Sequence, residues 1–171
     1  MAVIILVGFM GSGKTTLGKK LAKQLGYQFM DADDTIEKLH GATIQEIFAQ
    51  SGEAHFRKLE REFIAGLGET DNVVLATGGG MPCYGDNMEL LNKVGTTFYL
   101  KRPVGELAQR LVNAKRVRPL IQGKNHEELI AYINVLLPQR ELFYLRSDYT
   151  LEREQQQVLF IRFLLHKDGI C

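Results

Sequence analysis

The segment GFMGSGKTT, residues 8–16, places glycines, a lysine and a threonine at the spacing of a phosphate-binding loop. Directly after the apolar run AVIILV, it matches the pattern G-x-x-x-x-G-K-[ST] at Gly8, Gly13, Lys14 and Thr15. Backbone N–H groups of such a loop surround phosphate oxygens, and the start of the following helix adds partial positive charge. Lys14 can reach the β- and γ-phosphates, and the Thr15 hydroxyl can ligate Mg²⁺. We therefore predict a nucleoside triphosphate site rather than an ordinary glycine-rich turn.

Carboxylates follow another strand-like run, in DADD at residues 31–34. The carboxyl ends of parallel strands line the ligand crevice of an α/β sheet. Asp31 can therefore help to hold Mg²⁺ through water, and Asp33, two residues further on, can face an acceptor hydroxyl. The alternative is that an aspartate caps the helix expected over TIEKLH. We expect this of Asp34, and for Asp33 both interpretations stay open.

Three consecutive glycines end the apolar run in LATGGGMPC, residues 75–83. Glycine loses more backbone freedom on folding than any other residue, so a triplet needs a physical reason. One reason is a tight turn from a strand to a helix. The other is a stretch of backbone that a ligand must approach closely. The segment taken alone leaves both open.

An arginine lies between two glutamates at helical spacing in TIQEIFAQSGEAHFRKLEREFIAGL, residues 43–67. Thr43 and Glu46 fit a capping box that begins a short helix, which Gly52 ends. The next helix carries an apolar stripe, Phe56, Leu59 and Phe63, beside the charged residues Glu53, Arg57 and Glu60. By spacing alone, a solvated ladder of weak ion pairs is favoured over a binding role.

Basic residues are concentrated between positions 101 and 124. Seven basic residues face one acid, Glu106; they are Lys101, Arg102, Arg110, Lys115, Arg116, Arg118 and Lys124. The later half, NAKRVRPLIQGKN, contains proline and glycine and has weak helical periodicity, so we expect a loop. A mobile basic loop can fold over polyphosphate and supply a cation to the transition state. A nucleic-acid contact is the alternative, although no aromatic residues interleave with the charges.

Strand-like and helical patterns alternate along the chain. Strands are expected over 2–7, 27–32, 72–77, 95–100 and 147–152, and helical patterns over 14–26, 127–146 and 155–167. This alternation predicts an α/β fold with a parallel sheet that is buried on both faces.

Composition narrows the class of protein. The 171 residues suit one domain, and the net charge of +1 argues against a broad nucleic-acid surface. Two cysteines, Cys83 and Cys171, have no regular spacing, which favours a reducing compartment. The apolar opening MAVIILV is too short for a signal peptide or a membrane span, so we expect a cytoplasmic protein.

In combination, the motifs resemble those of shikimate kinases. GFMGSGKTT, DAD, FRKLE, TGGG, RPL and the late arginine in PQRELFY occur in the order and spacing of that family. The resemblance runs from about residue 3 to 165. It implies a three-layer P-loop fold with a five-stranded parallel sheet, and a single kinase domain over 1–171. It also implies a helical acceptor-binding segment at about 33–61 and a lid at about 112–125.

The resemblance implies a role for each candidate residue. The nucleotide site would use Gly11, Ser12, Gly13, Lys14, Thr15, Thr16, Arg110 and Arg118, with Thr15 and Asp31 as Mg²⁺ positions. The acceptor site would use Asp33, Arg57, Gly79, Gly80 and Arg140, with Glu60 as a supporting carboxylate that orients the arginines. The residues implied to be catalytic are Lys14, Asp33 and Arg118. A planar guanidinium suits the carboxylate of shikimate, and glycines at 79 and 80 would let the backbone lie against its ring.

The implied activity is transfer of phosphate from ATP to the 3-hydroxyl of shikimate, in aromatic amino acid biosynthesis. We expect Mg²⁺, a monomer, and neither nucleic acid nor membrane as a partner. The alternatives are a related kinase for gluconate or a nucleoside monophosphate, or a non-catalytic nucleotide-binding regulator. One departure concerns the late motif, usually Arg-x-Pro-x-Tyr, in which Leu142 replaces proline, so the chain direction after Arg140 is expected to differ.

Overall fold

Five parallel strands form one sheet in a computed structural model that describes residues 2–114 and 121–170. Their order is β2-β3-β1-β4-β5. The strands are β1 (Val3–Val7), β2 (Gln28–Asp31), β3 (Val73–Ala76), β4 (Thr96–Leu100) and β5 (Tyr149–Leu151). Every expected strand is therefore present, within a residue or two of its predicted ends.

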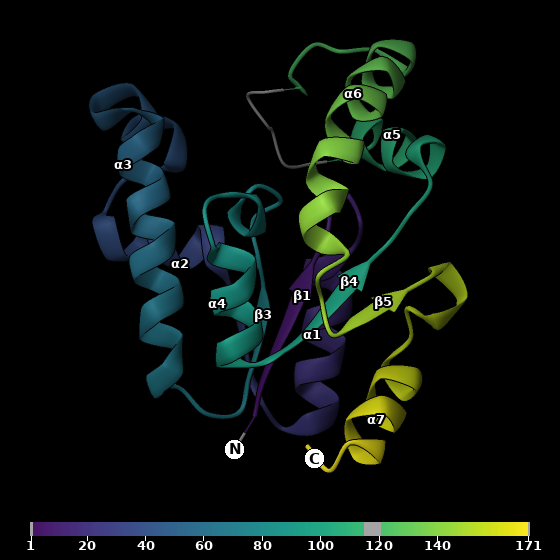
Figure 1. The fold of residues 1–171 in the computed structure, drawn as a ribbon. Helices are drawn as coiled ribbons and strands as arrows, with labels where there is room; N and C mark the ends of the chain where they lie inside the picture. The colour runs from purple at the N-terminus through teal and green to yellow at the C-terminus, as the bar shows by residue number, and fades with distance from the viewer. Residues whose placement is uncertain (1, 115–120, 171) are drawn as a thin grey trace.

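Helices connect the strands and cover the sheet (Figure 1). They are α1 (Lys14–Leu25), α2 (Ala32–His40), α3 (Ile44–Gly66), α4 (Asn87–Val94), α5 (Val104–Val112), α6 (His126–Tyr144) and α7 (Val158–Lys167). Short 3₁₀ turns lie at η1 (Leu67–Glu69), η2 (Met81–Cys83) and η4 (Arg153–Gln155). Among the described helices, none is both long and apolar enough to cross a membrane.

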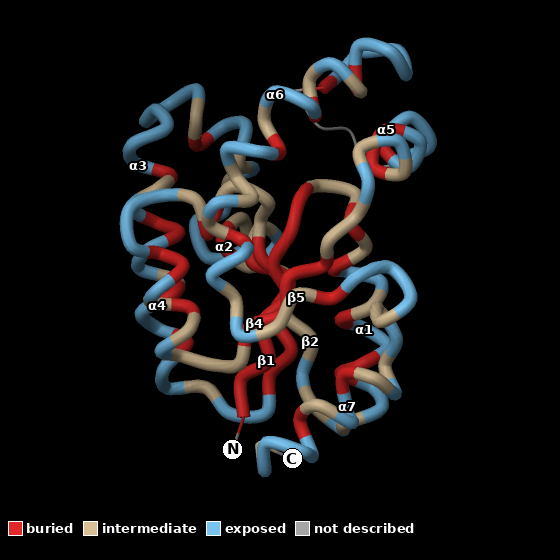
Figure 2. The backbone as a smooth tube through the Cα atoms, turned by 45° about the vertical axis from the view of Figure 1, so that its right-hand side comes forward, coloured by how far each residue is buried: buried red, intermediate tan, exposed pale blue. Residues whose placement is uncertain are grey.

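The side chains of β1 divide the core between the two faces of the sheet. Val3, Ile5 and Val7 pack with helices α2 to α6, whereas Ile4 and Leu6 pack with α1 and α7. Because successive residues of a strand point to opposite faces, an uninterrupted apolar run such as VIILV indicates a strand covered on both sides. Figure 2 shows β1 and β4 as mostly buried backbone at the centre, with exposed residues along the outer sides of the helices. The α/β, three-layer prediction is confirmed.

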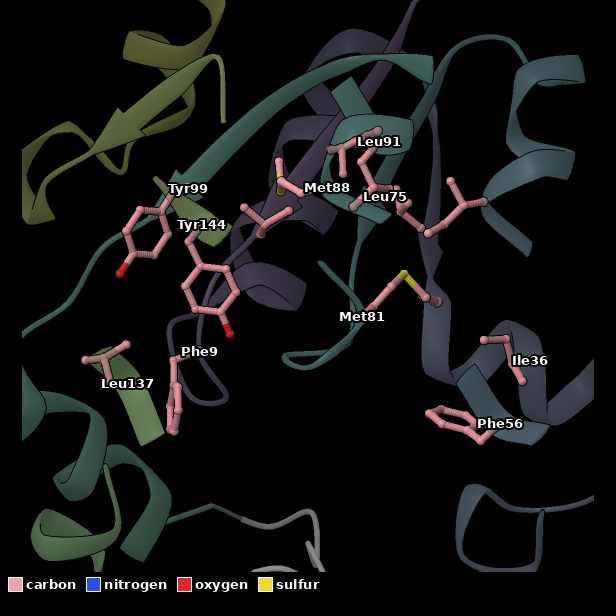
Figure 3. Close-up of a cluster of buried hydrophobic side chains, with 14 of the residues drawn as sticks. Phe9, Ile36, Phe56, Leu75, Met81, Met88, Leu91, Tyr99, Leu137 and Tyr144 are labelled. Atoms are coloured by element: carbon pink, nitrogen blue, oxygen red, sulfur yellow. The ribbon is translucent and has the colours of Figure 1, made fainter. Parts of the chain in front are cut away.

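The larger core cluster lies under α2, α3 and α6. It includes aromatic residues from distant elements, and Figure 3 shows Tyr99 of β4 beside Tyr144 of α6. Their ring centroids are 5.1 Å apart. Phe9, the second residue after β1, belongs to the same cluster. The core therefore anchors both the phosphate-binding loop and the end of α6, which carries Arg140.

Three strand ends meet at one edge of the sheet. In the register, Leu6 of β1 pairs with Ala76 of β3, and Asp31 of β2 pairs with the same Ala76. The loop after β1, the DADD segment and the glycine triplet thus begin side by side, at the carboxyl ends where α/β proteins bind ligands.

Two local expectations needed correction. Helix α2 begins at Ala32, and its N-cap is Asp31, whose carboxylate accepts a hydrogen bond from Asp34 N at 3.4 Å. Asp34 is therefore not the cap, and both Asp33 and Asp34 lie in the first helical turn. The second correction concerns the late motif. Helix α6 continues through Leu142 to Tyr144, so the chain stays helical after Arg140 and does not turn at Leu142.

Candidate active site

A cavity of about 700 Å³ opens at this edge of the sheet and brings together nearly all the predicted site residues. From the phosphate-binding loop and α1 it is lined by Gly11, Gly13, Lys14, Thr15 and Thr16, with Arg110 of α5 beside them. From the other side it is lined by Asp31, Asp33, Arg57, Glu60, Gly79, Gly80 and Arg140. Among the described residues, one predicted residue, Ser12, is not part of this lining. Ser12 is buried, and Arg118 lies outside the described residues.

Lys14 is folded into its own loop. Its ammonium group donates hydrogen bonds to Gly8 O at 2.7 Å and to Phe9 O at 3.0 Å, and the residue is 7% exposed. Gly8 and Gly13 have φ angles of 145° and 100°, which only glycine adopts readily. The loop thus wraps around the lysine, and the first turn of helix α1 lines the cavity.

Ser12 has a supporting place in this loop. It is 1% exposed, and its hydroxyl lies 3.5 Å from Lys14 Nζ. On the outer side, Arg102 donates from Nε to Ser12 O at 3.0 Å, and Arg110 donates from Nη1 to Gly11 O at 3.0 Å. These arginines hold the loop carbonyls on the outer side of the loop. Burial and the charge of Arg102 lower the pKa of Arg110. The two positive charges therefore lie close together beside the loop.

Thr15 and Asp31 meet as predicted for a metal position. The Thr15 hydroxyl donates to Asp31 Oδ2 at 3.0 Å. A hydroxyl and a carboxylate are hard oxygen donors, of the kind that Mg²⁺ takes together with water and substrate phosphates. The residues present therefore fit this ion.

Asp33 lies against the glycine triplet, although it comes from a helix and not from the strand end. A Cβ atom on Gly78 would be 2.6 Å from Asp33 Oδ1, so the carboxylate occupies the space that a side chain at position 78 would fill. The charge of Asp33 also contributes to raising the pKa of Glu60. Asp33 thus lines the cavity beside the glycine triplet and near Glu60.

Arg57 and Glu60 form a buried pair rather than a solvated ladder. Arg57 Nη1 donates to Glu60 Oε2 at 2.7 Å, and the side chains are 19% and 2% exposed. Burial raises the pKa of Glu60 to about 7, against the attraction of Arg57. Burial is the largest single effect on the pKa of Arg57 and lowers it, but the charge of Glu60 and the hydrogen bonds to Glu60 and Glu53 together raise that pKa. The interpretation favoured by spacing alone was wrong at Glu60.

Gly79 and Gly80 leave an open space in front of two guanidinium groups. A Cβ on Gly80 would lie 3.3 and 3.4 Å from the terminal nitrogens of Arg57 and 3.7 Å from Arg140 Nη2. A Cβ on Gly79 would lie 3.3 Å from both Arg140 Nη1 and Met10 N. The triplet is thus a turn and also a pocket floor. The terminal nitrogens of Arg57 and Arg140 lie directly against this floor.

Arg140 has a buried nitrogen that needs a hydrogen-bond acceptor. Among the described residues, its Nη1 atom is one of the buried nitrogen or oxygen atoms that lack a hydrogen-bond partner. Its guanidinium carbon lies 5.4 Å from the centre of the Phe9 ring. One turn later, the Tyr144 hydroxyl donates to Gly79 O, which ties the end of α6 to the pocket floor. A buried donor without an acceptor is costly, so this geometry favours an anionic ligand.

Several lining residues were not predicted. The start of α3 contributes Ile44, Gln45 and Phe48, and Phe56 follows after the kink at Gly52, where φ is 80° and ψ is 172°. The rings of Phe48 and Phe56 are 4.9 Å apart. The expected Thr43–Glu46 capping box is present and fixes this apolar wall. The sequence places Phe56 in an apolar stripe that faces the core, and nothing in its spacing distinguishes a core residue from a residue that lines the cavity.

The sheet order, the loop after β1 and the cationic half-pocket beside it define a P-loop kinase of small molecules. The family model described as "Shikimate kinase" matches residues 10–163, and the chain belongs to that family. A shikimate kinase from Parabacteroides distasonis is 45% identical over 155 residues, covering 91% of this chain and 90% of the relative.

Solved structures agree with this assignment. The crystal structure of shikimate kinase from Bacteroides thetaiotaomicron has a TM-score of 0.88 at 39% identity and covers 98% of both chains. Shikimate kinase from Acinetobacter baumannii, solved in complex with shikimate, has a TM-score of 0.79 at 37% identity. It covers 99% of this chain and 94% of that one. The recognition made from the motifs is confirmed.

The raised pKa of Glu60 predicts a pH-dependent stability. The folded protein binds this proton more tightly than the unfolded chain, whose glutamate titrates near 4.5. The contribution of Glu60 is therefore full below that pH and is lost as the pH rises to about 7. Relative to Glu60→Gln, wild-type stability should fall by about 3 kcal/mol over this range. Urea unfolding of both proteins in parallel measures it, and a constant difference would contradict a raised pKa.

Proposed function

We propose that this chain transfers the γ-phosphoryl group of ATP to the 3-hydroxyl of shikimate, giving shikimate 3-phosphate and ADP. The observation that carries the proposal is the space over Gly79 and Gly80, where the guanidinium groups of Arg57 and Arg140 converge. Shikimate is a small ring with one carboxylate and three hydroxyls. Two planar guanidinium groups suit that carboxylate, and the polyol side of the ring would then face Asp33.

The two halves of the cavity have different tasks in this proposal. Gly11, Gly13, Thr16 and the backbone of Ser12 bind phosphate oxygens, Lys14 moves from the loop carbonyls to the β- and γ-phosphates, and Arg110 lies beside the base. Asp33 orients the attacking hydroxyl and accepts its proton. Thr15 binds Mg²⁺ directly and Asp31 holds it through water; when bound, the ion neutralises phosphate charge.

The remaining assignments are proposals of the same kind. Residues 33–61 are the acceptor-binding segment and 112–125 the lid of one kinase domain spanning 1–171. Arg118 of the lid supplies a cation to the transferred phosphoryl group. The enzyme works as a cytoplasmic monomer, with shikimate and ATP as its partners and no nucleic acid or membrane.

A coupled assay of ADP release tests the proposed function. Shikimate, gluconate and nucleoside monophosphates are offered separately with ATP and Mg²⁺. We expect turnover with shikimate and with none of the other acceptors. Turnover with gluconate or a nucleoside monophosphate instead would support the related-kinase alternative. ATP binding without turnover of any acceptor would support a nucleotide-binding regulator.

Arg140→Lys should weaken acceptor binding while ATP binding stays unchanged. The substitution keeps the charge and loses the planar fork, so charge-assisted hydrogen bonds to the carboxylate are lost. We expect the KM for shikimate to rise roughly 10- to 100-fold. Arg146→Lys is the matched control, since Arg146 follows the same helix and pairs with Glu89 at the surface. An unchanged KM in the Arg140 variant would remove this residue from the acceptor site.

A further inference from the structure

Tyr84 is a half-exposed aromatic residue that the proposed reaction does not use. It follows η2 directly after the glycine triplet, and it is 39% exposed. Its ring nevertheless covers the acceptor arginine, because the guanidinium carbon of Arg57 is 3.7 Å from the ring centre. At this distance the planar guanidinium stacks on the ring face, an arrangement that restricts how the arginine can turn.

The edges of the Arg57 guanidinium are assigned to two different glutamates. Nε and Nη2 donate to Glu53 Oε1 at 3.3 and 3.0 Å, and Nη1 donates to Glu60 Oε2 at 2.7 Å. These bonds use one N–H of each terminal nitrogen, and each terminal nitrogen carries two. Each terminal nitrogen therefore has a second N–H group to offer a ligand, and a Cβ on Gly80 would lie almost equally far from the two nitrogens, at 3.3 and 3.4 Å, so both face the pocket floor.

Tyr84 also fixes the partner that sets this orientation. Its hydroxyl donates to Glu53 Oε1, the same oxygen that binds Arg57. This bond, followed by the bonds from Arg57, lowers the pKa of Glu53, and it raises the pKa of Tyr84. The Glu53 side chain is 53% exposed, so an ion pair with Arg57 alone would be weak. Tyr84 therefore contacts the face of the Arg57 guanidinium and also the Glu53 carboxylate at its side.

We infer that Tyr84 is a positioning residue for Arg57, and that it determines how well the acceptor site binds a carboxylate. The inference rests on the proposed function and deepens it. Tyr84 follows the pocket floor in the chain and lies 31 residues from Glu53 along the sequence. Its bond to Glu53 therefore also holds the floor against helix α3. Tyr84 itself touches the arginine and not the reacting atoms, so its effect should appear in acceptor binding.

The test measures kcat, the KM for each substrate, and the Kd of shikimate by calorimetry. Tyr84→Leu should raise the KM and Kd for shikimate roughly 3- to 30-fold and leave the KM for ATP unchanged. Tyr84→Phe keeps the stacked ring and loses the hydroxyl, so its increase should be smaller. In an Arg57→Lys background, Tyr84→Leu should cause no further increase, because the residue acts through the arginine.

Arg61→Gln is the matched control. Arg61 also joins α3 to the segment after the triplet, but its ion pair is with Asp86 and not with Glu53 or Glu60, the partners of Arg57. An unchanged KM for shikimate in Tyr84→Leu, or an equal increase in Arg61→Gln or in the Arg57→Lys background, would overturn the inference while wild-type turnover stands. Failure of the wild-type protein to phosphorylate shikimate in the same assay would overturn the proposed function, and this inference with it.

Discussion

Lys14→Ala is expected to remove nearly all ATP-dependent phosphorylation of shikimate, with a fall in kcat on the order of 10³-fold. The lysine supplies a positive charge to the β- and γ-phosphates at the point where charge is redistributed in the transition state. In the structure its ammonium group is held by Gly8 O and Phe9 O, inside the loop that would surround those phosphates. The measurement is steady-state kcat from the coupled assay.

A loss of activity through unfolding must be distinguished from a loss of chemistry. Alanine removes the lysine donor from Gly8 O, whereas Phe9 O keeps its bond from Ser12 N. A buried group left without its partner costs about 1–3 kcal/mol. Thermal unfolding of Lys14→Ala therefore accompanies the assay. Lys20→Ala is the matched control, because Lys20 is exposed on the same helix α1. Full turnover in a folded Lys14→Ala protein would end the assignment of the phosphate-binding loop.

The features that sequence reasoning found are those with a local cause. Strands β1 and β3 were readable because a parallel sheet that is covered on both faces favours uninterrupted apolar runs, here VIILV and VVLA. The end of α1 was readable because Gly26 adopts a φ of 69°, and the kink in α3 because Gly52 adopts a φ of 80°. In each case one residue type satisfies one backbone requirement.

The helices that were missed have weak ends. Helix α4 follows Asp86 without a side-chain capping bond and has eight residues. Helix α5 begins after Pro103 inside the basic patch. Its apolar residues, Leu107, Ala108 and Leu111, lie among charged residues that hide the helical pattern. That i, i+1, i+4 spacing on a buried face is the signal that identifies it. Asp34 was misassigned as a cap because the helix starts within the DADD segment itself.

The candidate site could be predicted as a set of residues but not as an arrangement. Glu60 looks like a surface residue in its spacing, and its burial follows from the packing of α3 against the rest of the fold. The contact between Arg57 and Tyr84 joins segments far apart in the sequence, so no local pattern reports it. Such contacts arise from tertiary structure, which is where residue spacing stops being informative.

Asp33→Asn is expected to lower kcat by roughly 10²- to 10⁴-fold, the range of general acid–base catalysis. A hydroxyl is a poor nucleophile, and a carboxylate within hydrogen-bond reach can orient it and accept its proton as the bond to phosphorus forms. Asp31 is the competing base. Its carboxylate already accepts hydrogen bonds from the Thr15 hydroxyl and from Asp34 N, and at the proposed metal position it would be used to hold the ion. Asp33 lies on the acceptor side, against Gly78 and near Glu60.

Asparagine keeps the size and hydrogen bonding of Asp33 and removes only the basic oxygen. ATP affinity by calorimetry should therefore stay unchanged, since Asp33 does not contact the nucleotide in this proposal. Asp34→Asn makes the same change in charge one residue away, at an exposed position of the same helical turn, and should leave kcat unchanged. Because phosphoryl-transfer transition states are loose, part of the effect of Asp33 is positioning, which places the expected loss toward the lower end of its range. A fall of less than about tenfold, below the general-base range, would leave Asp33 as a substrate-binding residue and nothing more.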